Sequence, residues 1–132
     1  MMTDQVENKD VKIICGNVFL RPDNIICVNL KDDYQIDLPD MIEINNAIEK
    51  IANGKKHGVL TVGGKYTSFS QDVIKNSNLP ENFTYTIADA FVIISMHQRL
   101  LANFYIQVIK PPVPTKYFEN TEDAIKWLYT FK

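Results

Sequence analysis

The residues whose types most resemble a binding or catalytic motif lie in one glycine-rich segment. Residues 63–68 read GGKYTS directly after a short apolar run, so they hold the ingredients of a phosphate cradle. A P-loop requires lysine and a serine or threonine at adjacent positions, because both must reach the phosphates and magnesium from one helix start. Here Tyr66 separates Lys65 from Thr67. The pattern therefore favours a structural turn followed by a helix cap over nucleotide binding, although helix-start amides beside Lys65 would accept an anion.

The other reactive side chains do not gather into a recognisable site. His57 and His97 fall in different predicted elements, and the cysteines show no metal-ligand spacing toward them. Cys15 and Cys27 have apolar neighbours, which is typical of buried free thiols in a reducing compartment and disfavours a disulfide. No serine stands in a nucleophile-elbow pattern. We therefore predict no catalytic residue, no enzyme activity, no metal and no cofactor.

One carboxylate differs from the rest. Most acidic residues stand at turns or in first helical turns, where capping and the helix dipole explain them. Asp89 precedes the most apolar strand of the chain, and a buried charge would need a partner there. A purely structural alternative is that Asp89 caps or ends a turn, and the sequence leaves both interpretations open.

Composition sets the class of protein. With 132 residues and 45% hydrophobic content, the chain can form one domain with a sizeable core, and we expect a flexible N-terminus over residues 1–10 and a single domain over residues 11–132. The 14 basic and 16 acidic residues form no blocks, which argues against nucleic acid as a partner. We see no signal peptide, and no apolar run reaches the roughly 18 residues of a membrane span. A cytoplasmic protein is the resulting expectation.

The elements that must position these residues are organised around residues 88–109. Residues 88–95 form an apolar run rich in β-branched side chains, which predicts an inner strand ending at Ser95. The next residues predict a packed helix to about residue 109, with apolar side chains at Met96, Leu100, Phe104 and Val108. Ser95 and Gln98 have the spacing of a capping box at the boundary.

The remaining segments alternate between strand and helix. Strands are predicted at 11–14, 18–21, 25–30, 58–62 and 116–118, and helices at 38–53, at about 71–77 and after Asn120 or Thr121, while residues 81–86 stay open between strand and irregular structure. Asp37 should cap the first helix, whose apolar stripe is Met41, Ile44, Ile48 and Ile51. This order predicts a mixed α/β fold, in which antiparallel N-terminal strands precede parallel strands and about four helices pack on the sheet.

These features resemble the SpoIIAA-like domains of the STAS/SEC14 type, which are small bacterial domains. The resemblance covers about residues 12–132 and rests on the element order, the apolar strand before Ser95, RLLANF at 99–104 and PTKYFENTEDAIKWL at 114–128. It implies a SpoIIAA-like sheet, frequent dimerisation, and kinship with anti-sigma factor antagonists and lipid-binding SEC14 domains. In the antagonists a serine at the corresponding helix start is phosphorylated, so the resemblance makes Thr67, Ser68 and Ser70 candidate phosphorylation sites. The Asp-Ser-Ser-Gly motif of the antagonists is absent from this loop.

Two functions follow as hypotheses. The first is a non-enzymatic regulatory or protein-interaction module that binds a protein partner or forms a homodimer. Its predicted binding residues are Gly63, Gly64, Lys65, Ser68, Phe69, Ser70, Met96 and Arg99. It predicts a contiguous exposed apolar patch near Phe69 and Met96. The alternative is a SEC14-like carrier of a small apolar ligand or lipid, which predicts an apolar cavity of roughly 300 to 1,000 Å³.

The aromatic residues bear on the same choice. We expect most of them in the core, although they could instead line an apolar pocket or supply a dimer face. The set is Phe83, Tyr85, Phe91, Phe104, Tyr105, Tyr117, Phe118, Trp127, Tyr129 and Phe131.

Overall fold

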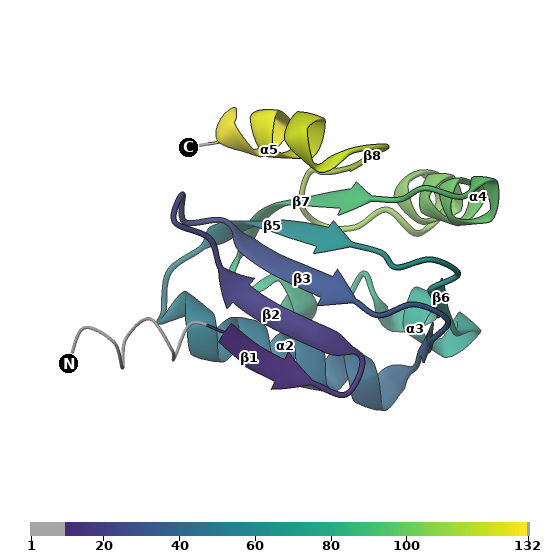
Figure 1. The fold of residues 1–132 in the computed structure, drawn as a ribbon, viewed down its shortest axis with the longest axis horizontal. Coiled ribbons are helices and arrows are strands. Elements are labelled where there is room, and N and C mark those ends of the chain that lie inside the picture. The colour runs from purple at the N-terminus through teal and green to yellow at the C-terminus, as the bar shows by residue number, and fades with distance from the viewer. Residues whose placement is uncertain (1–9, 132) are drawn as a thin grey trace.

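The computed structural model describes residues 10–131. The segment predicted to be flexible, residues 1–10, therefore lies outside the described residues except for Asp10, which begins the first strand. In chain order the elements are β1 (Asp10–Ile13), β2 (Gly16–Leu20), β3 (Ile26–Leu30), β4 (Gln35–Ile36), α2 (Leu38–Ala52), β5 (His57–Val62), β6 (Ser68–Phe69), α3 (Gln71–Asn76), the 3-10 turn η1 (Pro80–Phe83), β7 (Thr86–Val92), α4 (Met96–Phe104), the π-helical turn η2 (Tyr105–Ile109), β8 (Thr115–Phe118) and α5 (Thr121–Tyr129) (Figure 1).

The main sheet has six strands in the order β1-β2-β3-β5-β7-β8. The first three strands are antiparallel neighbours, and β3, β5, β7 and β8 are parallel neighbours. Parallel neighbours need long crossovers, and the segments holding α2, α3 and α4 supply them. The predicted mixed α/β sheet with antiparallel N-terminal strands is confirmed. The pairing of β4 with β6 was not predicted, because two residues are too few to show a period.

Helix α2 forms where its local signals place it. Asp37 caps it by accepting a hydrogen bond from the Leu38 amide, and Asp40 Oδ2 accepts one from the Asp37 amide at 3.0 Å. The helix ends at Asn53, whose φ of 53° is left-handed, one residue before the predicted stop at Gly54. The predicted stripe packs inward from α2, with Ile48 and Ile51 buried and Met41 and Ile44 half-buried.

Helices cover both faces of the sheet, and each face has its own core. In Figure 1, α2 runs behind β1, β2 and β3, whereas α5 lies beside β7 and β8. The core on the α2 face contains Val18, Ile26, Val28, Ile48, Ile51 and Val59. The core on the α5 face contains Cys27, Leu60, Ala88, Ala90, Val92, Ala124 and Leu128. Both cysteines are free and buried, Cys15 in the first core and Cys27 in the second, and burial raises the pKa of each thiol to about 11.

The strand and helix of residues 88–109 differ in detail from the prediction. Strand β7 spans Thr86–Val92, so it begins earlier and ends three residues before Ser95. Val92 is buried as expected, but Ile94 is 61% exposed in the connection to α4. The predicted helix also divides, because α4 ends at Phe104 and a π-helical turn completes it.

The apolar stripe predicted to pack α4 against the sheet faces outward instead. Met96, Leu100, Phe104 and Val108 are 73, 64, 48 and 59% exposed. Helix α4 lies past the end of β7 in Figure 1, so it can present only part of its surface to the rest of the molecule. That part carries Gln98, Leu101, Ala102 and Tyr105, a second set of positions three and four residues apart.

Candidate functional site

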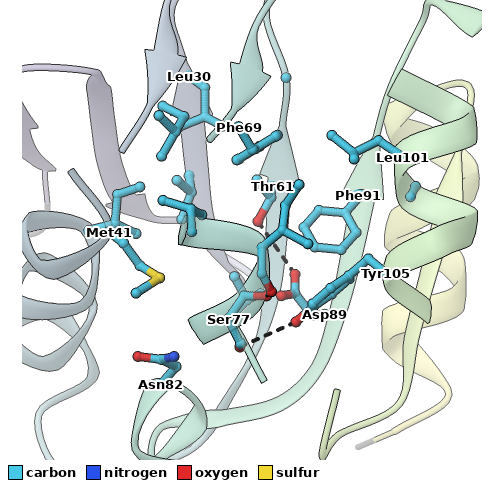
Figure 2. Close-up of a pocket in the computed structure, with 18 of the residues that line it drawn as sticks. Leu30, Met41, Thr61, Phe69, Ser77, Asn82, Asp89, Phe91, Leu101 and Tyr105 are labelled. Atoms are coloured by element: carbon cyan, nitrogen blue, oxygen red, sulfur yellow. Dashed lines mark hydrogen bonds between the residues drawn. The ribbon is translucent and has the colours of Figure 1, made fainter. Parts of the chain in front are cut away.

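The α2 face of the sheet holds a cavity of about 190 Å³. Strands β3, β5 and β7 form its floor, while α2, α3, η1, α4 and η2 surround it. Figure 2 shows Met41 entering from α2, opposite Phe91, Leu101 and Tyr105. Most lining side chains are aliphatic or aromatic, and none of the lining residues within the described part of the chain is Lys, Arg, His or Glu.

Sheet register places a carboxylate in this apolar floor. Directly paired residues of parallel strands point to the same face, and Asp89 pairs with Val59 while Phe91 pairs with Thr61. Val59 belongs to the core on the α2 face, so Asp89 points to the same side. Asp89 therefore lies in the middle of β7, not in a turn before the strand.

The Asp89 carboxylate has few polar neighbours. Thr61 Oγ1 donates a hydrogen bond to Oδ1 across a long 3.4 Å, and no described residue donates a hydrogen bond to Oδ2. Burial in these apolar surroundings raises the pKa of the Asp89 carboxyl to about 7, and the Thr61 hydrogen bond opposes this shift only in part. The group therefore changes its charge near neutral pH, where an ordinary aspartate is fully ionised.

Tyr105 stands next to Asp89 at the start of the π-helical turn. Burial raises the pKa of the Tyr105 phenol, and the Asp89 charge raises it further. Its hydroxyl donates a hydrogen bond to the Ser77 carbonyl oxygen at 3.4 Å, and its ring meets Phe91 edge to face with centroids 6.0 Å apart. Figure 2 shows Phe91 and Tyr105 beside the Asp89 carboxyl. π-Helical turns are frequent at functional sites, because they turn a side chain out of the regular helical register.

Gln98 joins α4 to the loop after β5. Ser95 caps α4 by accepting from the Gln98 amide at 3.1 Å, as predicted, but Gln98 Oε1 accepts from the Ile94 amide instead of completing the capping box. Gln98 Nε2 donates to the carbonyl oxygens of Gly64 at 3.0 Å and Thr67 at 3.1 Å. This buried amide thus fixes the position of α4 over the cavity.

The loop of residues 63–67 directs its amides at acceptors of the protein itself. The Gly64 amide donates to Thr67 Oγ1 at 2.8 Å, and the Lys65 amide donates to Asp32 Oδ1 at 2.7 Å. A Cβ at Gly64 would lie 2.6 Å from that Asp32 oxygen, so only glycine fits there. Gly63 donates to the Val92 carbonyl oxygen at 3.0 Å. These amides are not free to cradle a phosphate, which agrees with the structural turn favoured by the sequence.

The three hydroxyls singled out for phosphorylation lie in different surroundings. Thr67 is 1% exposed, and its hydroxyl donates to the Lys31 carbonyl oxygen at 2.8 Å. Ser68 is half-buried in β6. Ser70 caps α3 by accepting from the Val73 amide at 3.2 Å, and its hydroxyl donates to Asp37 Oδ1 at 2.9 Å. Ser70 therefore joins the starts of α2 and α3.

The other predicted binding residues separate into two groups. Phe69 is half-buried and lines the cavity, so it does not form an exposed patch with Met96. Arg99 pairs with Glu119 at 3.1 Å, with Nη2 as the donor atom. The exposed apolar patch lies instead along α4 and η2 and consists of Met96, Leu100, Phe104 and Val108.

Within residues 10–131 no group of three or more His, Cys, Asp or Glu side chains could hold a metal ion. His57 is buried, with Nδ1 2.7 Å from the Asn24 carbonyl oxygen, and His97 is exposed on α4. In the same part of the chain no helix is long and apolar enough to cross a membrane.

Sequence reasoning singled out Asp89 but missed its neighbours Thr61 and Tyr105 as site residues. Thr61 could have been found from register, because Thr61 and Asp89 are the polar residues inside the apolar parts of neighbouring parallel strands, residues 58–62 and 87–92. Tyr105 had no such signal. Its position depends on the π-helical turn, which nothing in the local sequence marks.

Comparison with solved structures shows the fold. The chain is similar to an uncharacterised protein of the DUF3478 family with a SpoIIAA-like fold from Shewanella loihica PV-4, at 16% identity over 84% of this chain and 90% of that one, with a TM-score of 0.57. The predicted SpoIIAA-like fold is thereby confirmed. A protein of unknown function from Arthrobacter sp. FB24 matches at 20% identity over 85% of this chain and 97% of that chain, with a TM-score of 0.29.

The search of curated proteins found no match. The model of a domain of unknown function, DUF7793, matches residues 18–132, which include the sheet from Val18 in β2 onward and every residue that lines the cavity. The chain belongs to the DUF7793 family.

Proposed function

We propose that this protein binds a small, mainly apolar ligand in the cavity between the sheet and α2, α3 and α4. The cavity around Asp89 is the observation that carries the proposal. A half-buried carboxyl with apolar surroundings and one long hydrogen bond lowers the stability of the fold, and perturbed carboxyls in clefts are typical of binding sites. Packing alone would favour an apolar residue at this position, so the carboxyl supports a role beyond the core.

The size of the cavity limits the ligand. Its volume of about 190 Å³ is below the range expected for a lipid carrier, so an acyl chain of lipid length does not fit. An apolar cavity of about 150 Å³ can bind benzene. The ligand class that fits is therefore a compact molecule of about one ring. Of the two ligands predicted from the sequence for a SEC14-like carrier, this size favours the small apolar ligand over a lipid.

An NMR titration tests this proposal. Adding toluene to ¹⁵N-labelled protein should shift the amides of lining residues on three elements, such as Val73, Phe91 and Ala102, in one saturable process. The variant Ala102→Leu adds three carbon atoms inside the cavity, so toluene should bind at least about fivefold more weakly, given that overpacking costs roughly 1–3 kcal/mol. Asn103→Leu is the control, because it places the same leucine side chain at a neighbouring position that does not line the cavity.

Two results would contradict the proposal. One is the absence of saturable shifts at lining residues. The other is equal weakening of toluene binding by Ala102→Leu and by Asn103→Leu, which would place toluene outside the cavity.

A second candidate function, the protein-interaction module, is supported by the outward stripe of α4 and η2. Met96, Leu100, Phe104 and Val108 follow one another at four-residue steps, so their exposed side chains form one continuous apolar line. Exposed apolar patches of this kind are typical of protein interfaces. We propose a second copy of this chain as the partner, in agreement with the homodimer predicted from the sequence, and Met96 and Arg99 of the predicted binding set then lie in or beside the interface.

Sedimentation velocity measures this self-association. The wild type should sediment as a dimer at micromolar concentration, and Leu100→Lys should sediment as a monomer, because a lysine in the middle of an apolar interface would be buried without a partner. Ile42→Lys is the matched control, because it places a lysine at a similarly exposed apolar position, 58% exposed on α2 and outside the stripe, and it should leave the dimer intact. A monomeric wild type would rule out this candidate.

Regulation by phosphorylation stays a proposal attached to this module. A phosphate on Ser70 would face Asp37, whose carboxylate now accepts the Ser70 hydroxyl, so repulsion would separate the starts of α2 and α3. Ser70→Asp should therefore alter dimer formation or ligand binding, whereas Ser70→Ala should have the smaller effect. Equal behaviour of the two variants would count against a phosphorylation switch at this residue.

A further inference from the structure

We infer that the ligand of this cavity carries a protonated amine on its compact apolar body, and that the Asp89 carboxylate binds the amine. This inference deepens the proposed function and rests on the cavity being a ligand site. It names the chemical class of the ligand, and the geometry of the polar groups in the cavity wall carries it.

Most side-chain amides and hydroxyls of the cavity wall already have hydrogen-bond partners within the protein. Asn45 donates to Asn82, Asn82 donates to the Asn76 carbonyl oxygen, and Ser77 donates to the Ile74 carbonyl oxygen, each within 2.8 Å. Gln98 uses both ends of its amide, as described above. Asp89, by contrast, accepts one hydrogen bond at 3.4 Å and has a second oxygen with no donor among the described residues. A ligand that donates hydrogen bonds therefore finds a free acceptor at this point of the wall.

Charge separates an amine from a neutral donor. A carboxylate in apolar surroundings is stabilised best by an opposite charge, and the described lining supplies no lysine, arginine or histidine. An alcohol would donate one hydrogen bond and leave the charge uncompensated. An ammonium group supplies up to three donors together with the missing positive charge, and its hydrogen bonds to a carboxylate are charge-assisted.

The aromatic neighbours fit the same head group. Phe91 and Tyr105 lie next to Asp89, and their rings form an edge-to-face pair. Aromatic rings attract a cation that approaches their faces. A carboxylate flanked by aromatic rings is therefore suited to an organic ammonium ion, whereas it would repel a carboxylate ligand.

The protonation state of Asp89 gives the inference a pH signature. Because burial raises its pKa to about 7, Asp89 is largely neutral below neutral pH and ionised above it. The neighbouring groups do not add a pH dependence of their own near neutrality. The pKa of Tyr105 from η2 is raised further from neutrality. The other polar neighbours do not titrate; they are Thr61 from β5, Thr115 from β8, Asn45 from α2, Asn82 from η1, Ser77 after α3 and Gln98 from α4. Amine binding should therefore strengthen as pH rises through about 7.

Four probes with one ring and similar size test the inference: benzylamine, benzyl alcohol, toluene and benzoate. We expect benzylamine to bind the wild type most tightly at about pH 8 and benzoate to bind most weakly. In Asp89→Asn, benzylamine should lose about tenfold or more in affinity, the range expected for a hydrogen bond between charged groups. Toluene makes no use of the carboxylate, so its affinity should change less than about threefold, well below that range. Thr61→Val removes the competing hydroxyl, and benzylamine should still bind to it.

A second measurement needs no variant. In the wild type the affinity for benzylamine should rise at least about tenfold between about pH 5 and about pH 8, because a carboxyl with a pKa of about 7 is ionised in only about one molecule in a hundred at pH 5 and in most molecules at pH 8. Toluene affinity should stay flat over the same range. If toluene binds but benzylamine shows neither the pH dependence nor the loss in Asp89→Asn, the amine inference is overturned while the proposed pocket stands. If none of the four probes shifts the lining residues, the proposed function itself fails and the inference fails with it.

Discussion

Strand β7 carries two contrasting environments on its two faces. On the α5 side, Ala88, Ala90 and Val92 are buried against Ala124 and Leu128, so helix and sheet approach closely. On the α2 side, Asp89 and Phe91 line a cavity. Small apolar residues at alternate positions thus close one face, while a carboxyl and a ring between them keep the other face open. The contrast shows a difference in packing: the α5 face is closely packed and contributes to stability, whereas the cavity and the carboxyl on the α2 face reduce the contribution of that face.

The closed face is further held at its edge by polar contacts. Tyr129 of α5 donates a hydrogen bond to Asp23 Oδ2 at 2.6 Å, and Arg21 pairs with Asp23 Oδ1 at 3.0 Å. Burial opposes ionisation of this carboxyl, but the hydrogen bonds from Arg21 and Tyr129 lower the pKa of Asp23 to about 2. Asp23 is therefore stabilised as a carboxylate by its partners, whereas Asp89 on the other face has no cation beside it.

The largest expected difference between the faces comes from removing a leucine from each. Leu128→Ala should lower the free energy of unfolding by about 3 kcal/mol, because it leaves a new hole in a packed core. Leu101→Ala should cost about 1 kcal/mol, since Leu101 is half-buried and already borders a cavity. Urea unfolding monitored by circular dichroism measures both. Equal losses would remove the distinction between the two faces.

The next effect is a gain in stability from removing the carboxyl. Asp89→Asn should raise the free energy of unfolding by roughly 2 kcal/mol at about pH 8, because the folded state no longer holds a charge in apolar surroundings. The pKa of Asp89 is about 7 in the folded protein and is near 4 when exposed, so the folded state binds more protons over that window. Wild-type stability should therefore fall as pH rises from about 4 through about 7, and the variant should lack this decline. Chemical unfolding at several pH values measures the difference, and parallel pH profiles would contradict the assignment.

The smallest expected change in stability comes from a substitution that fills part of the cavity. Ala102→Leu should leave stability unchanged or raise it by about 0.5–1 kcal/mol, as cavity-filling substitutions commonly do. The matched change on the closed face, Ala90→Leu, should cost about 1–3 kcal/mol through overpacking. Thermal unfolding of the pair tests the contrast. A comparable loss in both variants would mean that no usable space exists beside Ala102.

Much of the fold could be predicted because its signals are local. Asp37 and Asn120 cap their helices where the sequence places helix starts, and the stripe of α2 packs inward as its period indicates. The predicted inner strand, however, is displaced, since a charged residue at position 89 marks a strand end by pattern but not in this structure. The reason is tertiary: the register with β5 places Asp89 at a cavity, where its charge is tolerated.

The site itself could be predicted only in part. Helix α4 has two apolar stripes, and the one that packs is decided by where the helix lies relative to the end of β7. The sequence contains both stripes and does not rank them: Leu100 and Phe104 of the stripe predicted to pack are exposed, whereas Leu101 and Ala102 line the cavity. Asp89 is distinctive in the sequence because its neighbours in the chain are apolar. The residues that contact it in the structure, however, come from elements far apart in the chain.

The most direct test of the account is the titration of Asp89 itself. With ¹³C-labelled protein, the carboxyl resonance of Asp89 can be followed by NMR from about pH 3 to about pH 9 and assigned by its loss in Asp89→Asn. The account predicts a midpoint of about 7, because the carboxyl lies in an apolar cavity with one long hydrogen bond and no cation beside it. A midpoint near 4, the value of an exposed aspartate, would show that water or a positive charge reaches Asp89 and would contradict the account.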